Sequence, residues 1–233
     1  MLDEAIRNKV WKIAESYYPK NDWAHGRSHI ERVIRSAVEI GKQEGADIEV
    51  IELAAILHDI FVKYEYNIQH REAHSRADGF RHEIEAAKES RRILGKLGIS
   101  GTTIEAVAHC IEAHRKRSSS EPQTIEAKCL FDADKLDCIG AIGVTRSPFV
   151  SFEHGQEFYK VESDIEAYKR KNVRADGTII DFRLHSSNLE YELSLKEVAK
   201  RMHTKTGRRL SEGRAAFMDA FYERFAEELK GRL

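Results

Sequence analysis

The adjacent residues His58 and Asp59 are the part of the sequence that most clearly indicates chemistry. They follow the continuous apolar run Ala54–Leu57, so both side chains are expected at the buried end of a core helix. A buried carboxylate is costly unless it is paired or bound to a cation. Because a neutral imidazole beside a carboxylate suits a divalent ion, this pair predicts half of a metal site.

The remaining ligands must come from elsewhere in the chain. His29 lies at the edge of an apolar stripe that includes Ile30 and Val33, so its side chain can face inward. Three further candidates lie in an otherwise apolar helical segment: Asp132, Asp134 and Asp137. At least one of these carboxylates is expected to point into the interior, although spacing alone does not select it. A site of two histidines and two aspartates would keep positions open for water and substrate, as catalytic metal sites do.

Helices are expected to position these residues, because apolar side chains recur every three or four positions. The predicted helices cover residues 6–17, 30–41, 47–57, 81–97, 102–114, 125–136 and 205–229. Asp47 is predicted to cap the third helix, and Thr102 with Glu105 has the spacing of a capping box for the fifth. Residues 61–80 are polar and are predicted to form a loop.

The last third of the sequence has a different character. Residues 151–187 are polar and aromatic, and the turn signal at Asp176–Gly177 predicts at most a small hairpin there. One stripe of the last helix is expected to be buried: Leu210, Phe217, Phe221, Phe225 and Leu229. We therefore predict an all-α protein, with a metal-binding helical core over residues 1–148 and a C-terminal extension over residues 149–233.

The composition argues against several classes of protein. Lys and Arg number 38 and Asp and Glu number 39, so no basic excess favours a nucleic-acid polymer as partner. The short basic run His114–Arg117 is interpreted as a solvated helix end. Three cysteines, none spaced as CxxC, indicate reduced thiols rather than a zinc ribbon or a disulfide framework. No segment has the ~20 apolar residues of a membrane span. The protein is therefore expected to be soluble and cytoplasmic.

Several motifs together resemble one known family. They are Asp22–Val33, which contains His29; Leu53–Ile60, which contains His58 and Asp59; and Glu126–Gly143, which contains Asp134. Their order and spacing resemble the HD-domain superfamily of metal-dependent phosphohydrolases. The third motif, with the C-terminal stretch Thr204–Phe221, resembles a bacterial and archaeal branch of HD hydrolases that includes nucleotide pyrophosphohydrolases. The likeness is weakest over residues 149–187.

The resemblance implies an HD-domain helical bundle and one divalent metal ion, whether Mn, Ni, Co, Fe, Zn or Mg. By position, the implied metal ligands are His29, His58, Asp59 and Asp134, which selects Asp134 among the three aspartates. The sequence departs from the branch just after His58-Asp59, where the branch often has another acidic residue. Here the apolar segment Ile60–Val62 comes before Lys63, so the metal is better defined than the substrate.

Other polar residues are candidates for roles at the site. Phosphoryl transfer needs neutralisation of charge on oxygen, for which the substrate-binding candidates are His25, Lys63, His82, His109 and His114. His109 and His114 do not share a helix face, and His114 is preferred. The catalytic candidates are Asp59, Glu83 and Asp137, through proton handling or orientation of a ligand histidine. Glu83 can also be an ordinary acid in the first turn of a helix. The other histidines are expected at the surface: His70, His74, His154, His185 and His203.

The expected function is hydrolysis of a phosphorylated small molecule, with a nucleotide as the expected substrate. The enzyme would be a nucleoside triphosphate pyrophosphohydrolase or a nucleotidase. One alternative is a two-metal enzyme with phosphodiesterase or oxygenase-like activity, in which His82 and His114 add ligands. Another alternative is a non-catalytic regulatory protein that binds a metal or a nucleotide. No membrane partner is expected, and the aromatic C-terminal helix could pack on this chain or on a second copy.

Overall fold

The computed structural model shows a helical protein. It describes residues 3–18, 20, 22, 24–65, 80–115, 120–161, 164–175, 177 and 179–232. These residues contain no strand, and their β-type pairing is limited to two isolated bridges, Glu157 with Ser186 and Val173 with Ile179. The predicted all-α class is confirmed.

The chain divides into two compact units, which are described in turn. The first comprises Met1–Asp137 together with Met202–Arg208, and the second comprises Cys138–Arg201 together with Arg209–Leu233. The last helix, α11 (Lys205–Leu229), therefore contributes its first residues to the first unit and the others to the second. The division into a core at residues 1–148 and an extension at 149–233 stays a prediction.

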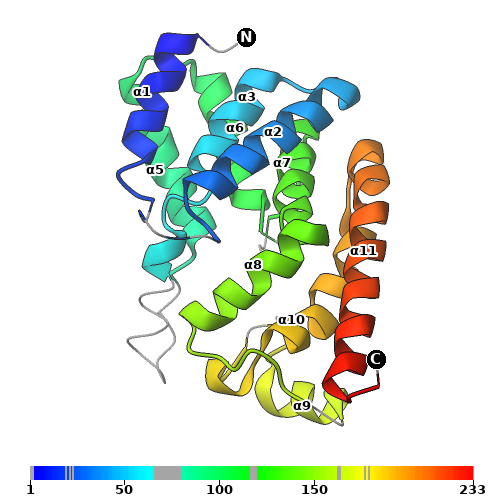
Figure 1. Ribbon diagram of the computed structural model, residues 1–233. Helices are drawn as coiled ribbons and strands as arrows, with labels where there is room; N and C mark the ends of the chain where they lie inside the picture. The colour runs from blue at the N-terminus through cyan, green and yellow to red at the C-terminus, as the bar shows by residue number, and fades with distance from the viewer. Residues whose placement is uncertain are drawn as a thin grey trace. The chain divides into compact units, whose positions relative to one another are not determined.

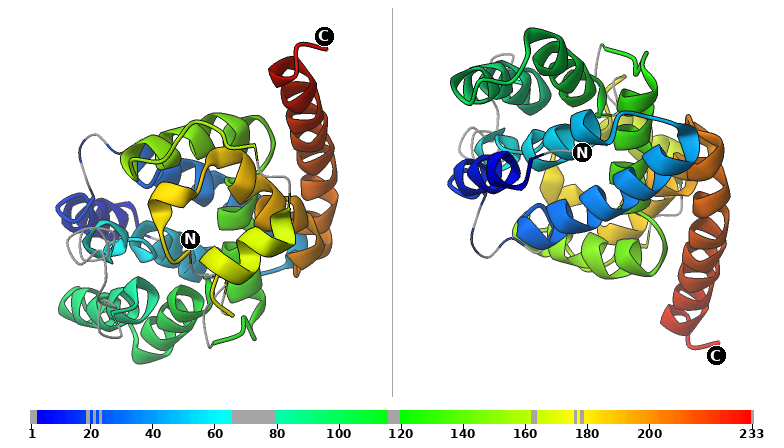
Figure 2. Two further views of the ribbon diagram at one scale, coloured as in Figure 1. Left: turned by 90° about the horizontal axis from the view of Figure 1, so that it is seen from below. Right: turned by 90° about the horizontal axis from the view of Figure 1, so that it is seen from above.

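Six helices make up most of the described part of the first unit (Figure 1). They are α1 (Glu4–Ala14), α2 (Arg27–Glu44), α3 (Ile48–Leu57), α5 (His82–Lys96), α6 (Gly101–Ala113) and α7 (Ile125–Leu136). α3 is central, because it packs against each of the other five. α2 also packs against α7, and α5 against α6 (Figure 2). The segments that carry the predicted ligands thus belong to neighbouring helices.

α3 delivers its C-terminal residues into the core. The carboxylate of Asp47 accepts hydrogen bonds from the backbone N–H groups of Glu49 and Val50, so the predicted cap is confirmed. All side chains of Leu53–Leu57 are fully buried. Burial of apolar area stabilises such a helix by about 25 cal/mol per Å². Because α3 ends at Leu57, His58 and Asp59 follow in the interior, as the sequence predicts.

Two local predictions for the first unit need correction. The cap of α6 is Ser100, whose hydroxyl accepts a hydrogen bond from the backbone N–H of Thr103. The helix therefore starts before Thr102, because the chain turns at Gly98, which has a positive φ of 77°. Residues 62–65, predicted as part of a loop, are helical, and residues 66–79 lie outside the described part of the chain.

Asp132 fixes the start of α11 on the first unit. Its carboxylate accepts hydrogen bonds from the backbone N–H groups of His203 and Thr204, each at 2.8 Å, and from the Thr204 hydroxyl at 2.7 Å. Gly207 is needed beside it, because a Cβ there would lie 2.1 Å from Oδ2 of Asp132. One of the three aspartates of this segment therefore has a structural task.

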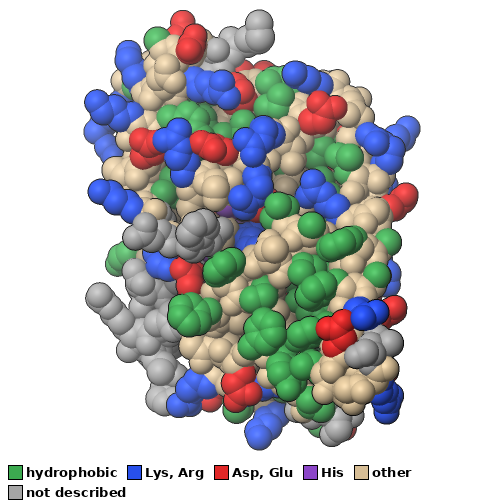
Figure 3. All heavy atoms as spheres, in the orientation of Figure 1, with side chains coloured by type: hydrophobic (Ala, Val, Ile, Leu, Met, Phe, Trp, Pro, Cys, Tyr) green, Lys and Arg blue, Asp and Glu red, His purple; other side chains and the backbone are tan. Residues whose placement is uncertain are grey.

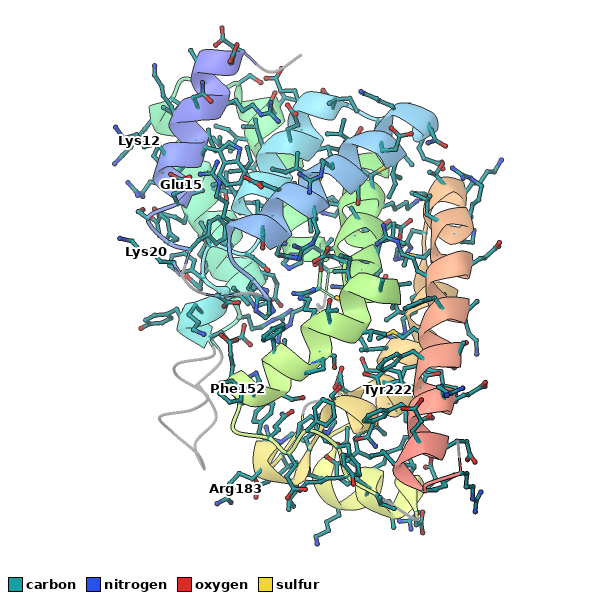
Figure 4. All side chains as sticks on the ribbon, in the orientation of Figure 1. Lys12, Glu15, Lys20, Phe152, Arg183 and Tyr222 are labelled. Carbon is teal, nitrogen blue, oxygen red and sulfur yellow. The ribbon has the colours of Figure 1, made fainter. Side chains whose placement is uncertain are left out.

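The second unit is also helical. Its elements are α8 (Gly140–Glu153), α9 (Ile165–Asn172), the 3-10 helix η1 (Phe182–Leu184), α10 (Ser187–Leu193), the 3-10 helix η2 (Leu195–Arg201) and most of α11. α10 packs against α8. Tyr222 extends from α11 toward α10 (Figure 4), and its hydroxyl lies 3.0 Å from that of Ser187.

Residues 151–187 contain more helix than expected. α8 continues through Pro148, and Asp164 caps α9 by accepting a hydrogen bond from the backbone N–H of Ala167. In place of a hairpin there is the single antiparallel bridge between Val173 and Ile179. Asp176, in the predicted turn, lies outside the described residues. Short helices are hard to recognise in a polar segment, because their capping residues are then the main signal in the sequence.

The predicted buried stripe of α11 is wrong. Phe217 and Phe221 are 51% and 38% exposed, whereas Ser211, Met218 and Tyr222 face inward. Figure 3 shows hydrophobic side chains gathered over α8 and α11 of the second unit. Two apolar stripes run along this helix, and spacing alone cannot say which of them packs.

His185 is buried rather than at the surface. Its Nδ1 lies 2.8 Å from the hydroxyl of Tyr168, and its Nε2 lies 3.0 Å from Glu190. His154 and His203 are partly exposed, and His70 and His74 lie outside the described residues. The three cysteines are free thiols. Across the described helices, none combines the length and apolar character needed to cross a bilayer.

Candidate metal centre

The four side chains predicted as metal ligands meet inside the first unit. α2 supplies His29, the end of α3 supplies His58 and Asp59, and α7 supplies Asp134. Nε2 of His29 lies 3.6 Å from Oδ2 of Asp59 and 3.6 Å from Oδ1 of Asp134. Nε2 of His58 lies 3.5 Å from the same oxygen of Asp59. All four side chains are buried, so their polar atoms face one another rather than bulk water.

The two oxygens of Asp59 face two different pairs of imidazoles. Oδ2 faces His29 and His58, whereas Oδ1 lies 3.4 Å from Nε2 of His82 and 3.5 Å from Nε2 of His114. The Nε2 atoms of His82 and His114 are 3.4 Å apart. A carboxylate in this position can bind one cation or bridge two.

Two of these imidazoles are held by backbone carbonyls. Nδ1 of His58 donates to the carbonyl of Ala55 at 2.9 Å, and Nδ1 of His114 donates to that of Ile111 at 2.7 Å. A carbonyl oxygen can only accept, so Nδ1 carries a proton, and in a neutral ring Nε2 then keeps its lone pair. Each Nε2 is therefore available as a metal ligand, in the tautomer that ligating histidines normally adopt.

The donor set fits a divalent cation. Burial lowers the pKa of His58 to about 4, so the ring is neutral at neutral pH. Its Nε2 is buried and makes no hydrogen bond with any described residue. A buried polar atom left in that condition is destabilising, whereas a bound cation would satisfy it. Two imidazoles with two carboxylates suit borderline ions such as Mn, Fe, Co, Ni or Zn.

The carboxylates of the cluster are ionised. Burial alone would raise the pKa of Asp59, but His58 and the neighbouring imidazoles hold it well below its usual range. The same holds for Asp134, where the ammonium of Lys135 contacts the carboxylate and lowers its pKa against the effect of burial. The cluster therefore presents two negative charges to a cation.

Asp137 orients His29 from behind. Its Oδ2 accepts a hydrogen bond from Nδ1 of His29 at 2.7 Å, and Nε of Arg32 donates to its Oδ1 at 2.6 Å. The three aspartates of the apolar segment thus divide their tasks: Asp134 faces the site, Asp137 holds a candidate ligand, and Asp132 caps α11. Arg32 is not identified by the sequence pattern, since a single cation on a helix gives no signal.

His82 is held by a carboxylate instead of a carbonyl. Its Nδ1 lies 2.5 Å from Oε2 of Glu65. Burial opposes a charge on His82, but hydrogen bonds to Asp59 and Glu65 outweigh burial and raise the pKa of His82 to about 9. At neutral pH this ring is therefore cationic, whereas that of His58 is neutral.

A cluster of charged residues lies beside the imidazole pair of His82 and His114. Arg115 lies 3.0 Å from Glu65 and 3.3 Å from Glu83, and Glu83 also pairs with Arg81 at 2.7 Å. The interpretation of Arg115 as part of a solvated helix end is therefore wrong, while Lys116 and Arg117 lie outside the described residues. Glu83 sits in the first turn of α5 and is fully buried. Sequence analysis does not identify Glu65, which lies in a polar segment without periodicity.

Lys63 and His25 both contact Asp22. Oδ2 of Asp22 lies 3.7 Å from Nζ of Lys63 and 3.8 Å from Nδ1 of His25. Asp22 also accepts hydrogen bonds from the backbone N–H groups of Ala24 and His25, which fixes the loop before α2. The ring centroid of His25 is 6.1 Å from that of His29, so this loop borders the cluster.

His109 lies apart from the contacts described above. Its Nε2 accepts a hydrogen bond from the backbone N–H of Gln123 at 3.1 Å. The preference for His114 over His109 agrees with the geometry, because His114 faces Asp59. A substrate-binding role for His109 has no support in the described contacts, since the helix turns its ring toward the loop before α7.

Comparison with known families gives a match over the segment that carries the cluster. Residues 26–139 match the HD domain, and this range includes every imidazole and carboxylate that lies around Asp59. Residues 26–139 form an HD domain. HD domains bind divalent metals, in agreement with the donor set described above. The first motif begins just before this range and the aspartates of α7 lie near its end.

The likeness to known proteins extends over almost the whole chain. YpgQ from Bacillus subtilis strain 168 is 28% identical over 233 residues, which cover 98% of this chain and 94% of YpgQ. The crystal structure of YpgQ in complex with ADP has a TM-score of 0.67 at 24% identity, covering 97% of this chain and 100% of that one. An HD-superfamily hydrolase from Bacillus thuringiensis has a TM-score of 0.65 at 24% identity, covering 97% and 98%. The fold is that of the HD-superfamily hydrolases.

Proposed function

We propose that this protein is a divalent-metal-dependent phosphohydrolase that acts on a nucleotide. The observation that carries the proposal is the convergence of four buried donors from three helices, in which Nε2 of the neutral His58 faces the ionised Asp59. A site with two imidazoles and two carboxylates keeps positions open for water and for a substrate oxygen.

His29 and His58, which face Oδ2 of Asp59, would hold the cation together with Asp59 and Asp134. When bound, a divalent cation polarises a phosphoryl oxygen and makes a water molecule more acidic. Asp137 keeps the proton of His29 on Nδ1, so that Nε2 is directed at the cation site.

His82 and His114, which face Oδ1 of Asp59, would bind the phosphoryl group. His82 is cationic and buried, so its charge acts with little screening on negative oxygen atoms nearby. His114 lies beside it, with its Nε2 3.4 Å from Nε2 of His82. Lys63, whose side chain is partly exposed beside Asp22, would bind phosphate groups farther from the cation. Phosphoryl transfer depends mainly on such positioning and charge neutralisation.

A nucleotide is the proposed substrate class because YpgQ, which covers nearly the whole chain, has been crystallised with ADP. A nucleoside triphosphate carries several negative oxygens, which suits a cation site flanked by His82 and Lys63. The narrower proposal is a nucleoside triphosphate pyrophosphohydrolase or a nucleotidase.

A two-metal enzyme is the second candidate. It is favoured by the two oxygens of Asp59, which face two separate pairs of imidazoles. In that case His82 and His114 would be ligands of a second cation, and Asp59 would bridge the two ions. Such an enzyme would have phosphodiesterase or oxygenase-like activity.

A screen of metals and substrates tests the proposal. Chelator-treated protein is supplied with Mn²⁺, Ni²⁺, Co²⁺, Mg²⁺ or Zn²⁺ and offered nucleoside triphosphates, nucleoside monophosphates and cyclic nucleotides. We expect metal-dependent hydrolysis, with pyrophosphate released from a triphosphate by a pyrophosphohydrolase and orthophosphate released from a monophosphate by a nucleotidase. Metal ions counted per chain separate one cation from two. Tight binding of metal and nucleotide without turnover of any substrate would instead indicate a regulatory protein.

A further inference from the structure

Glu65 accepts two hydrogen bonds at the start of α5. Its Oε2 lies 2.5 Å from Nδ1 of His82 and 3.1 Å from the backbone nitrogen of the same residue. His82 is the first residue of α5, and Arg81 at the cap position makes no side-chain capping bond. Glu65 therefore serves the helix start from outside the helix, where its negative charge lies at the positive end of the helix dipole.

Arg115 holds Glu65 from the opposite side. Its Nη1 lies 3.0 Å from Oε1 of Glu65 and 3.3 Å from Oε2 of Glu83. Glu83 in turn contacts Arg81, so negative and positive side chains alternate. Glu65 and Glu83 are 5% and 0% exposed, and buried carboxylates persist only when they are paired in this way.

The contacts of Glu65 fix the orientation of the His82 ring. Because Nδ1 donates to Glu65, the ring cannot turn without losing this bond, and Nε2 stays directed at Asp59 and His114. Arg115 in turn fixes the carboxylate of Glu65. Arg115 directly follows His114, the residue at the C-terminal cap of α6. His82 is thus held by this cluster of charges, while His114 adjoins the cluster in the chain and is held by the carbonyl of Ile111.

We propose that Glu65 is a positioning residue, which fixes the ring of His82 at the site while Arg115 fixes Glu65. The effect on hydrolysis rests on the proposed function, whereas the effect on the ring does not. The segment Ile60–Val62, directly after His58 and Asp59, has no acidic residue. The next carboxylate along the chain is that of Glu65, which contacts His82.

A purely structural cluster would behave differently. If the charges merely joined α5 to α6, their removal would lower stability and affect every property of the site together. A positioning role instead predicts that the state of the His82 ring and kcat change while the affinity for the metal does not.

The test uses the full chain and four variants. Glu65→Ala removes the acceptor, and Glu65→Gln keeps an acceptor oxygen without the charge. Arg115→Lys keeps the charge of Arg115 but replaces the planar guanidinium with a compact ammonium that has fewer N–H donors, and it serves as a second variant if Glu65→Ala does not fold. Glu105→Gln is the matched control, because it removes an exposed carboxylate that pairs with Arg91 between the same two helices.

Four quantities are measured for each variant. They are the ¹⁵N chemical shifts of the His82 ring in metal-free protein, assigned by means of His82→Gln; the affinity for Mn²⁺; the thermal midpoint; and kcat and KM on the nucleotide that the screen identifies. The ring measurement needs no turnover. It therefore tests the positioning role even if the proposed hydrolysis fails.

We expect Glu65→Ala to abolish the signature of a hydrogen-bonded Nδ1–H and to lower kcat about 10- to 100-fold, with the affinity for Mn²⁺ unchanged. Glu65→Gln should keep the ring signature and lose less kcat, and Arg115→Lys should fall between the two. Glu105→Gln should match the wild type. An unchanged ring signal in Glu65→Ala, or losses of kcat that simply follow the thermal midpoint across all variants, would overturn the proposal.

Discussion

Each pair of imidazoles around Asp59 has one ring held by a carbonyl and one held by a carboxylate, so the contrast lies between two single rings, His58 and His82. His29, His58, His82 and His114 all direct Nε2 toward the same carboxylate. Behind His58 stands a neutral carbonyl oxygen, whereas behind His82 stands the carboxylate of Glu65. Burial lowers the pKa of His58 to about 4, whereas hydrogen bonds to Asp59 and Glu65 outweigh burial and raise the pKa of His82 to about 9.

The difference teaches that the surroundings of each ring, rather than its distance from Asp59, decide what its Nε2 can do. A neutral ring offers a lone pair to a cation, while a protonated ring offers a proton to an anion. The half of the site that contains His58 therefore offers a lone pair to a metal ion, and the half that contains His82 offers a proton to a phosphate oxygen. Asp59 belongs to both halves, because each of its oxygens faces one pair.

Asp59→Asn should have the largest effect, because it removes the charge that the two halves share. We expect stoichiometric Mn²⁺ binding to disappear and kcat/KM to fall by at least about 1,000-fold, the upper range for loss of one preorganised electrostatic group. Calorimetry with Mn²⁺ and steady-state kinetics measure the two effects. Glu121→Gln, a substitution of an exposed carboxylate, is the control. Retained Mn²⁺ binding in Asp59→Asn would contradict the assignment of the metal centre.

His58→Gln and His82→Gln should break the two halves separately. The first variant should lose the metal ion, because a neutral donor is removed. The second should keep one ion per chain and lose about 100-fold in kcat, as expected when one charged group near the reacting oxygens is removed. Metal content by mass spectrometry, with kcat, distinguishes them. A drop from two ions to one in His82→Gln would favour the two-metal enzyme.

Asp137→Asn should weaken the metal half without dismantling it. An amide oxygen still accepts the Nδ1–H of His29, but the charge that Asp137 shares with Arg32 is lost. Groups that orient ligating histidines typically contribute 10- to 100-fold to metal affinity, and we expect a loss of about 10-fold. The Mn²⁺ dissociation constant measures it. An affinity equal to that of the wild type would show that Asp137 does not orient a ligand.

The lowered pKa of His58 should appear as a small pH dependence of stability in the metal-free protein. The unfolded ring binds a proton near pH 6.5 and the folded ring near pH 4, so stability is lost as pH falls between these values. Between pH 7.5 and pH 5.5 this amounts to roughly 1 kcal/mol. Urea unfolding of His58→Gln should show a loss smaller by that amount. Equal losses in both proteins would mean that His58 is not buried as a neutral ring.

The burial of His58 and Asp59 could be predicted from the sequence, whereas the contacts that hold the His82 ring could not. His58 and Asp59 follow an apolar run, which signals burial, and Asp134 lies in an apolar helix. The roles of Glu65 and Arg115 depend on contacts between segments that are distant in sequence and polar in composition. Periodicity carries no information about such pairings.

A similar limit applies to the fold. Long helices such as α2 and α3 are marked by an apolar stripe or run and by caps, and their positions are close to those predicted. α9 and α10 are short and polar, so few apolar positions mark them. In α11 the periodic pattern gave the helix but not its buried face, because Phe217 and Met218 lie on adjacent stripes and only packing selects between them.

The contact between Asp132 and the start of α11 links the metal centre to the order of protein synthesis. Every candidate ligand has left the ribosome once Asp134 has been made, yet Thr204 is made much later, after Cys138–Arg201 of the second unit. Until then Asp132 lacks the donors that satisfy its fully buried carboxylate, and α7, which also carries Asp134, has no anchor at that point. A nascent chain or a fragment that ends before residue 203 should therefore contain every ligand and still fail to retain the ion.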